Sequence, residues 1–156
     1  MKKLIEGFTR QLGEALRIGQ AADLVRQGDI RNVLITGMGG SGIGANLVES
    51  LTFGRVPIPI IVCKGYNIPQ FVSPHTLFIA CSYSGNTEET LSAVQKAMLK
   101  RSHIICITSG GKMLELAKEY NFLYIQSLPS DLGSHRVIGY RGSYILWPTP
   151  AFSRPR

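Results

Sequence analysis

A loop rich in hydroxyl groups follows the apolar run 77–81 and directly precedes a segment with helical spacing. The loop reads Ser82-Tyr83-Ser84-Gly85-Asn86-Thr87 and is called the hydroxyl loop below. Where a strand leads into such a loop at a helix N-terminus, backbone N–H groups and the helix dipole attract an anion, and serine and threonine hydroxyls add uncharged donors. A phosphate monoester suits this chemistry. The alternative is an ordinary turn in which Thr87 caps the helix.

A second loop has the glycine pattern of dinucleotide-binding proteins. It reads Gly37-Met38-Gly39-Gly40-Ser41-Gly42, is called the glycine loop below, and lies between an apolar run and a helical segment. Dinucleotide sites also need an acidic residue about 20 positions later to bind a ribose hydroxyl. This chain has Val62-Cys63-Lys64-Gly65 at that position, where only Lys64 could meet a 2′-phosphate. The missing acid argues against an NAD(P)-dependent oxidoreductase, which stays a less favoured alternative.

The sequence argues more strongly against a nucleotide-binding P-loop than against a dinucleotide site. Such a loop needs a hydroxyl residue directly after its Gly-Lys pair to bind the metal of the nucleotide. The chain has one Gly-Lys pair, Gly111-Lys112, and Met113 follows it. We interpret Lys112 as a solvent-exposed residue in the first turn of a helix.

Alternating strands and helices must position these loops. Apolar runs predict strands at 32–36, 58–63, 76–81, 103–108 and 122–126, and helical spacing predicts helices at 3–26, about 43–51, 88–101 and 112–120. This alternation indicates an α/β fold with a doubly wound, five-stranded parallel sheet of flavodoxin-like order 2-1-3-4-5. In that order strands 1 and 3 are neighbours, so both loops line one crevice at their carboxyl ends. Glu88 and Glu89 must then point away from a bound phosphate.

Composition narrows the possible classes of protein. The formal net charge is +7, but residues 132–156 carry four arginines and no acid, which leaves 7 − 4 = +3 for residues 1–131. With no basic stripe and no alternation of aromatic and basic residues, we expect no nucleic-acid partner. No apolar run reaches the roughly 20 residues of a membrane helix. Three cysteines without metal-binding spacing favour a reducing, cytoplasmic location and no metal site.

The composition also suggests a boundary between a domain and a C-terminal tail. Residues 1–131 form the predicted domain, and residues 132–156 form an atypical C-terminal tail without clear periodicity, lysine or acid. The abrupt change after Asp131 suggests a shifted reading frame or a truncation.

With both loops placed, the chain resembles the sugar isomerase (SIS) domain family, and most of all the N-terminal SIS domain of bifunctional phosphoglucose/phosphomannose isomerases. The resemblance extends from the first helix to about Ser130, and the hydroxyl loop is its most specific element. It rests on the two loops and on Tyr66-Asn67-Ile68-Pro69, Glu88-Glu89-Thr90-Leu91 and Ile107-Thr108-Ser109-Gly110-Gly111.

The resemblance implies a function. Ser41, Ser82, Ser84 and Thr87 would hold the phosphate of a hexose 6-phosphate, with Gly39 and Gly40 next to the sugar. Enzymes of this type interconvert aldose and ketose phosphates through a cis-enediolate, without a metal or redox cofactor. They carry two SIS domains in one chain and pair as dimers.

The chain departs from this pattern in two ways. The glutamate base and the ring-opening histidine of the family lie in a second domain that is absent here. The family's arginine, which stabilises the enediolate, follows two prolines, whereas this chain offers only Arg136 after a sequence without them. We therefore expect a phosphosugar-binding domain with little isomerase activity alone. The alternative is a non-catalytic phosphosugar sensor or assembly module.

Overall fold

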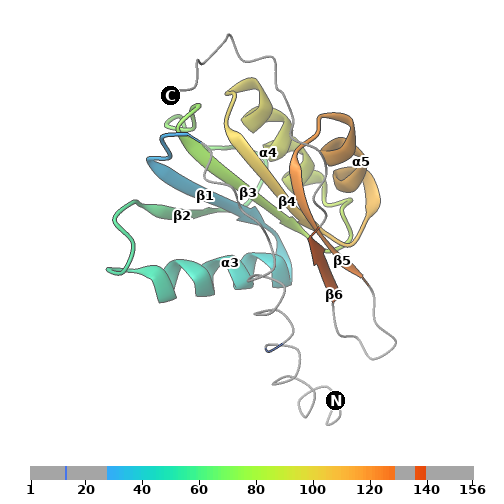
Figure 1. The fold of residues 1–156 in the computed structure, drawn as a ribbon, viewed down its shortest axis with the longest axis horizontal. Coiled ribbons are helices and arrows are strands. Elements are labelled where there is room, and N and C mark those ends of the chain that lie inside the picture. Colours follow the sequence, from blue (N-terminus) through green and yellow to red (C-terminus); the bar gives the residue numbers. More distant parts are fainter. Residues whose placement is uncertain (1–12, 14–27, 129–135, 140–156) are drawn as a thin grey trace, which may run out of the picture.

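The computed structural model describes residue 13, residues 28–128 and residues 136–139, and Figure 1 shows their arrangement. The predicted helix 3–26 lies almost wholly outside these residues. Three helices alternate with the strands of one sheet. The elements in chain order are β1 (Asn32–Gly37), α3 (Gly39–Thr52), β2 (Ile60–Cys63), β3 (Thr76–Ser82), α4 (Glu88–Leu99), β4 (His103–Thr108), α5 (Gly111–Glu119), β5 (Leu123–Leu128) and β6 (Arg136–Gly139).

The sheet confirms the predicted strand order. Its order is β2-β1-β3-β4-β5-β6, and the first five strands run parallel. The sixth strand was not predicted. It pairs antiparallel with β5, so that Arg136 at the start of β6 lies beside Leu128 at the end of β5. Part of the segment that we assigned to the atypical tail therefore extends the sheet.

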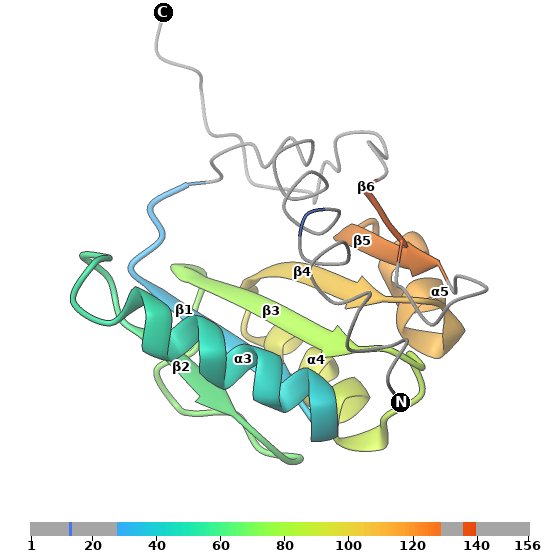
Figure 2. The ribbon, with the colours of Figure 1, turned by 90° about the horizontal axis from the view of Figure 1, so that it is seen from below.

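Helices cover both faces of the sheet. In Figure 2, α3 lies in front of β1 and β2, and α4 and α5 lie behind the sheet. The larger core faces α4 and α5 and contains fully buried side chains such as Leu34, Phe78 and Met113. The smaller core faces α3 and is formed by Val33, Ile35 and Ala45 with half-buried neighbours. Because both strand faces are covered, the strands read as continuous apolar runs.

Within the residues that the structure describes, no helix is both long and apolar enough to cross a membrane. The same residues bring together no group of three His, Cys, Asp or Glu side chains that could hold a metal ion.

Candidate ligand-binding site

The glycine loop and the hydroxyl loop leave the sheet from neighbouring strands, as predicted. The end of β1 pairs with the end of β3, and Gly37 stands opposite Cys81. A β-carbon on Gly37 would lie 2.9 Å from the backbone oxygen of Cys81 and 3.1 Å from the β-carbon of Ser41. The strand end therefore has no room for a side chain at Gly37. The two loops thus begin side by side at the carboxyl edge of the sheet.

Internal hydrogen bonds organise the hydroxyl loop. The side-chain oxygens of Ser82 and Thr87 lie 2.8 Å apart, and the same Ser82 oxygen accepts a bond of 3.1 Å from the amide of Gly85. Ser82 is buried and ends β3, whereas Ser84 is exposed and accepts a bond of 3.3 Å from the amide of Asn86. The first hydroxyl is thus fixed inside the loop, and the second reaches solvent.

The helices that follow the two loops have N-termini without a side-chain cap. Neither Met38 before α3 nor Thr87 before α4 makes a side-chain cap hydrogen bond in the described part of the chain. The alternative in which Thr87 caps the helix is therefore not realised, because its hydroxyl is bonded to Ser82 instead. The first N–H groups of a helix need acceptors from outside the helix. Both N-termini thus offer donors and positive dipole ends at the carboxyl edge of neighbouring strands.

The N-terminus of α5 differs, because its amides are used to hold the hydroxyl loop. The amide of Lys112 donates to the side-chain oxygen of Asn86 at 3.1 Å, and the amide of Met113 donates to the backbone oxygen of Gly85 at 2.9 Å. Ser109 adds a backbone bond of 3.0 Å to Tyr83 and a second bond through its hydroxyl. Residues 109–113 therefore form a support that fixes the shape of the hydroxyl loop.

Sequence reasoning did not identify this support. The sequence signal was present, since Ser109-Gly110-Gly111 follows β4 as the hydroxyl loop follows β3. A β-carbon on Gly111 would lie 2.5 Å from the backbone oxygen of Ser84, so this glycine permits the close contact between the loops. Which of several glycines serves such a contact depends on strand register, which a single sequence does not specify.

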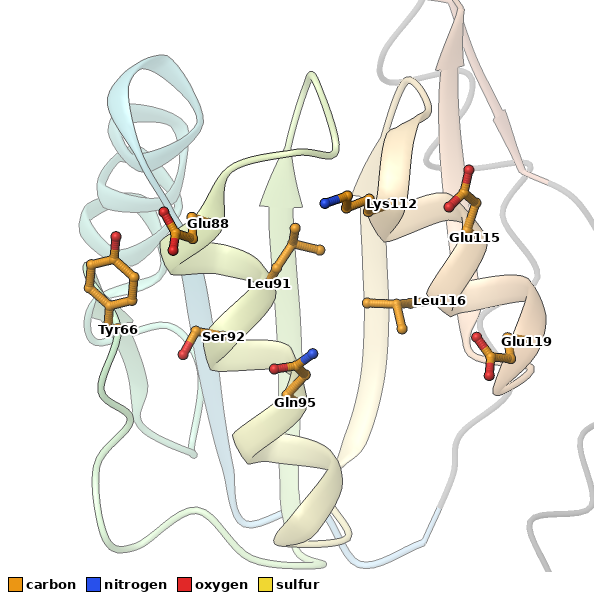
Figure 3. Close-up of a pocket in the computed structure, with 9 residues that line it drawn as sticks. All are labelled: Tyr66, Glu88, Leu91, Ser92, Gln95, Lys112, Glu115, Leu116 and Glu119. Atoms are coloured by element: carbon orange, nitrogen blue, oxygen red, sulfur yellow. The ribbon is translucent and has the colours of Figure 1, made fainter.

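Glu88, the first residue of α4, lies toward Tyr66. Glu88 points toward the Tyr66 ring in Figure 3 and lines an open groove between α4 and α5. Desolvation and the negative charges of Glu88 and Glu89 raise the pKa of the Tyr66 phenol, and Glu88 also forms a hydrogen bond with it. None of Gly39, Gly40, Ser41, Ser82, Ser84 and Thr87 lines this groove. The Glu88 carboxylate is thus directed toward Tyr66 and the groove, as we expected for this one of the two glutamates.

Lys96, in the last turn of α4, and Lys64, directly after β2, both donate hydrogen bonds within the domain. Lys96 donates to the backbone oxygen of Tyr66 at 2.7 Å and to the side-chain oxygen of Asn67 at 2.9 Å, which ties the segment after β2 to α4. Lys64, at the position where a dinucleotide site needs an acid, donates to the side-chain oxygen of Asn46 at 2.7 Å. The end of β2 therefore presents a lysine bound to an amide rather than a ribose-binding carboxylate.

The described histidines lie at the opposite edge of the sheet. His103 begins β4 and pairs with Leu77 near the start of β3, and His75 bonds to the backbone oxygen of Asp29 at 3.0 Å. Burial is the main cause that lowers the pKa of His103. Neither histidine can reach a ligand at the carboxyl edge, so both are surface or packing residues.

Arg136 begins β6 at the carboxyl edge of β5. Two strands, β4 and β5, stand between β6 and β3. At about 4.8 Å per strand spacing, the backbone of Arg136 is about 14 Å from β3. The structure therefore does not place it beside the hydroxyl loop, and its role in stabilising an enediolate stays a prediction.

Three thiols on β2, β3 and β4 and one hydroxyl on α4 are partly or fully buried. Burial raises the pKa of the Cys81 thiol to about 11 and that of Cys106 to about 12, and Cys63 is raised for the same reason. All three thiols are free. Thr90 is 1% exposed, and its hydroxyl has no hydrogen-bond partner among the described residues.

Comparisons with known proteins agree with this fold. No protein-family model matches the chain. A bifunctional phosphoglucose/phosphomannose isomerase of Caldicellulosiruptor bescii is 43% identical over 141 residues, which are 90% of this chain and 41% of that protein. A protein of the same name from Thermoplasma acidophilum is 41% identical over 84% of this chain and 39% of its own length. The chain thus spans about two fifths of the length of these curated relatives.

A solved structure supports the fold independently. The tagatose-6-phosphate ketose/aldose isomerase from Escherichia coli superposes with a TM-score of 0.53 at 18% identity, over 79% of this chain and 36% of that one. At this identity the likeness concerns the arrangement of strands and helices alone.

Proposed function

We propose that this chain, a SIS-domain protein homologous to the bifunctional phosphoglucose/phosphomannose isomerases, binds the phosphate group of a sugar phosphate between its glycine and hydroxyl loops. One observation carries the proposal: two helix N-termini without side-chain caps begin at neighbouring strand ends, and serine and threonine hydroxyls lie between strand and helix in the second loop. Phosphate is the ligand group that this combination of N–H donors, hydroxyls and dipoles suits best.

The residues take distinct roles in this proposal. Ser84 and the first amides of α4 would contact the phosphate directly, and Thr87 would reach it once its bond to Ser82 opens. Ser41 and the amides of Gly39 and Gly40 would approach from the other loop, next to the sugar. Uncharged donors hold a phosphate without burying a lysine or arginine, which avoids the high desolvation cost of a buried cation.

The chemistry of a complete enzyme of this kind would be aldose–ketose isomerisation. A base removes the proton from the carbon next to the carbonyl, a cis-enediolate forms, and the proton returns to the neighbouring carbon, so no redox cofactor is consumed. His75 and His103 stand at the wrong edge of the sheet for this step. We therefore expect this chain alone to bind substrate and to turn it over slowly or not at all. We further propose that it acts in the cytoplasm as a homodimer.

Ligand-dependent thermal stabilisation tests the proposal. Glucose 6-phosphate and fructose 6-phosphate should each raise the unfolding temperature, while glucose, NAD and NADP should not. Replacing Ser82→Ala together with Ser84→Ala should abolish the response to sugar phosphates. Ser92→Ala, a half-buried serine on α4 that lines the groove, is the matched control and should respond like the unaltered protein. A response to NADP with none to sugar phosphates would overturn the proposal.

A further inference from the structure

Glu88 opens the helix whose N-terminus belongs to the proposed phosphate site, so its negative charge opposes the binding of a phosphate there. It is the first residue of α4, and its side chain is exposed. The positive end of a helix dipole attracts a carboxylate as well as a phosphate. A Glu88 side chain without restraint would therefore turn toward the same N–H groups and repel a bound phosphate.

Tyr66, in the segment between β2 and β3, is placed to restrain Glu88. Figure 3 shows the Glu88 carboxylate directed toward the Tyr66 hydroxyl, and the hydroxyl donates a hydrogen bond to it. Among the residues that the structure describes, Glu88 forms no salt bridge with a lysine, arginine or histidine. A phenol is an uncharged donor, so it fixes where the carboxylate lies without cancelling the charge.

Two contacts hold the segment that carries Tyr66 in place. Lys96, in the last turn of α4, donates to the backbone oxygen of Tyr66 at 2.7 Å and to the side-chain oxygen of Asn67 at 2.9 Å. The Cys63 thiol donates to the backbone oxygen of Asn67 at 3.1 Å. Because Lys96 and Glu88 belong to one helix, Tyr66 keeps a fixed position relative to the first turn of α4.

The groove between α4 and α5 gives the Glu88 carboxylate a place outside the phosphate site. Tyr66 and Glu88 both line this groove, and none of the residues predicted to bind the phosphate or the sugar does. We propose that Tyr66 is a positioning residue of the phosphate site: its hydroxyl holds the Glu88 carboxylate on the groove side of α4, away from the bound phosphate. This inference rests on the proposed function of the two loops.

Loss of the Tyr66 hydroxyl should weaken the binding of a sugar phosphate, because the Glu88 carboxylate can then approach the ligand. Moving a carboxylate from about 9 to about 6 Å from a doubly charged phosphate, at an effective dielectric constant of about 40–80, raises the dissociation constant about two- to fivefold. The loss should depend on salt, since the Debye length falls from about 30 Å at about 0.01 M ionic strength to about 3 Å at about 1 M.

Calorimetric titration of the full chain with glucose 6-phosphate tests the proposal. Tyr66→Phe should bind about two- to fivefold more weakly than the unaltered protein at about 0.01 M ionic strength, and the ratio should approach one at about 1 M. Tyr120→Phe is the matched control: Tyr120 is 41% exposed, close to the 47% of Tyr66, but it lies at the end of α5 and does not line the groove. Its replacement should leave the affinity unchanged, and both variants should keep the circular dichroism spectrum of the unaltered protein.

The Glu88→Gln variant shows whether Tyr66 acts through Glu88. In that background Tyr66→Phe should not change the affinity, because no charge remains to be held away from the phosphate. If Tyr66→Phe weakens binding equally in both backgrounds, Tyr66 acts on the ligand itself and the proposal is overturned, as it is if Tyr66→Phe leaves the affinity of the unaltered background unchanged. An unaltered protein that binds no sugar phosphate would instead overturn the proposed function, and this inference with it.

Discussion

Replacing Gly85→Ala should damage both the stability of the domain and its ligand site. Gly85 has a backbone φ of +67°, a conformation that L-residues other than glycine rarely adopt. A β-carbon at this position would overlap the backbone oxygen of Gly110 and lie 2.8 Å from the Thr108 hydroxyl. Backbone atoms cannot turn aside as a flexible side chain can, so the two loops would have to separate.

The cost follows from two contributions. The left-handed conformation costs alanine about 1 kcal/mol relative to glycine. Separating the loops weakens the bond from the Ser109 amide to Tyr83 and the bond from the Met113 amide to Gly85. At roughly 0.5–1.5 kcal/mol for each bond, the free energy of unfolding should fall by about 3 kcal/mol in total.

Urea unfolding followed by circular dichroism measures this change. Gly54→Ala is the control, because Gly54 has a similar φ of +70° but no atom within 4 Å of the added carbon, so only the conformational cost of about 1 kcal/mol should appear. Calorimetric titration with glucose 6-phosphate should show at least tenfold weaker binding for Gly85→Ala and unchanged binding for Gly54→Ala. Equal loss of stability in the two variants would refute the reasoning.

Three further changes have defined outcomes. Asn86→Ala removes the acceptor for the Lys112 amide and should lower the free energy of unfolding by about 1–2 kcal/mol in urea titrations, with weaker sugar-phosphate binding in calorimetry; unaltered affinity would contradict the support role. Thr90→Val removes a buried hydroxyl that has no partner among the described residues and should stabilise the protein by about 1 kcal/mol in the same unfolding assay, whereas a loss of stability would reveal a partner. Because burial raises the pKa values of Cys81 and Cys106 above that of an unfolded thiol, the folded state holds more protons above about pH 9. Stability should be fully present below pH 9 and fall toward pH 11 by up to about 1.4 kcal/mol per pH unit for each thiol, with a smaller slope for Cys81→Ala.

Most of the sheet was predictable because buried parallel strands leave a strong local signal. The run His103–Thr108 was predicted with the bounds that the structure has, and the other strands differ by one or two residues at their ends. The placement of both loops at one edge followed from the strand order. The strand β6 was missed because the four residues Arg136–Gly139 carry too little periodicity to be recognised without their partner β5.

The hydrogen bonds within the candidate site could not be predicted from the sequence. The Ser82–Thr87 bond, which occupies the hydroxyl that a cap by Thr87 would have used, was not predicted, since two hydroxyls five residues apart meet only when the loop turns as it does here. The hydrogen bonds that join this support to the hydroxyl loop, from Lys112 to Asn86 and from Ser109 to Tyr83, each connect residues 26 positions apart in the sequence. Such contacts follow from register and loop shape, and neither can be derived from local spacing.

The support beneath the hydroxyl loop has a consequence for the order in which the protein folds. The loop itself ends at Thr87, yet the bonds that support it from outside come from residues 109–113, after a whole helix and the strand β4. A chain emerging from the ribosome can therefore form β1 and β3 early but cannot complete its ligand site until Met113 has been made and β4 has docked. The entropy of closing this 26-residue connection precedes any gain from the contacts, so formation of the site should be a late step. Ligand added during refolding should accordingly bind after the sheet appears and should not speed its formation.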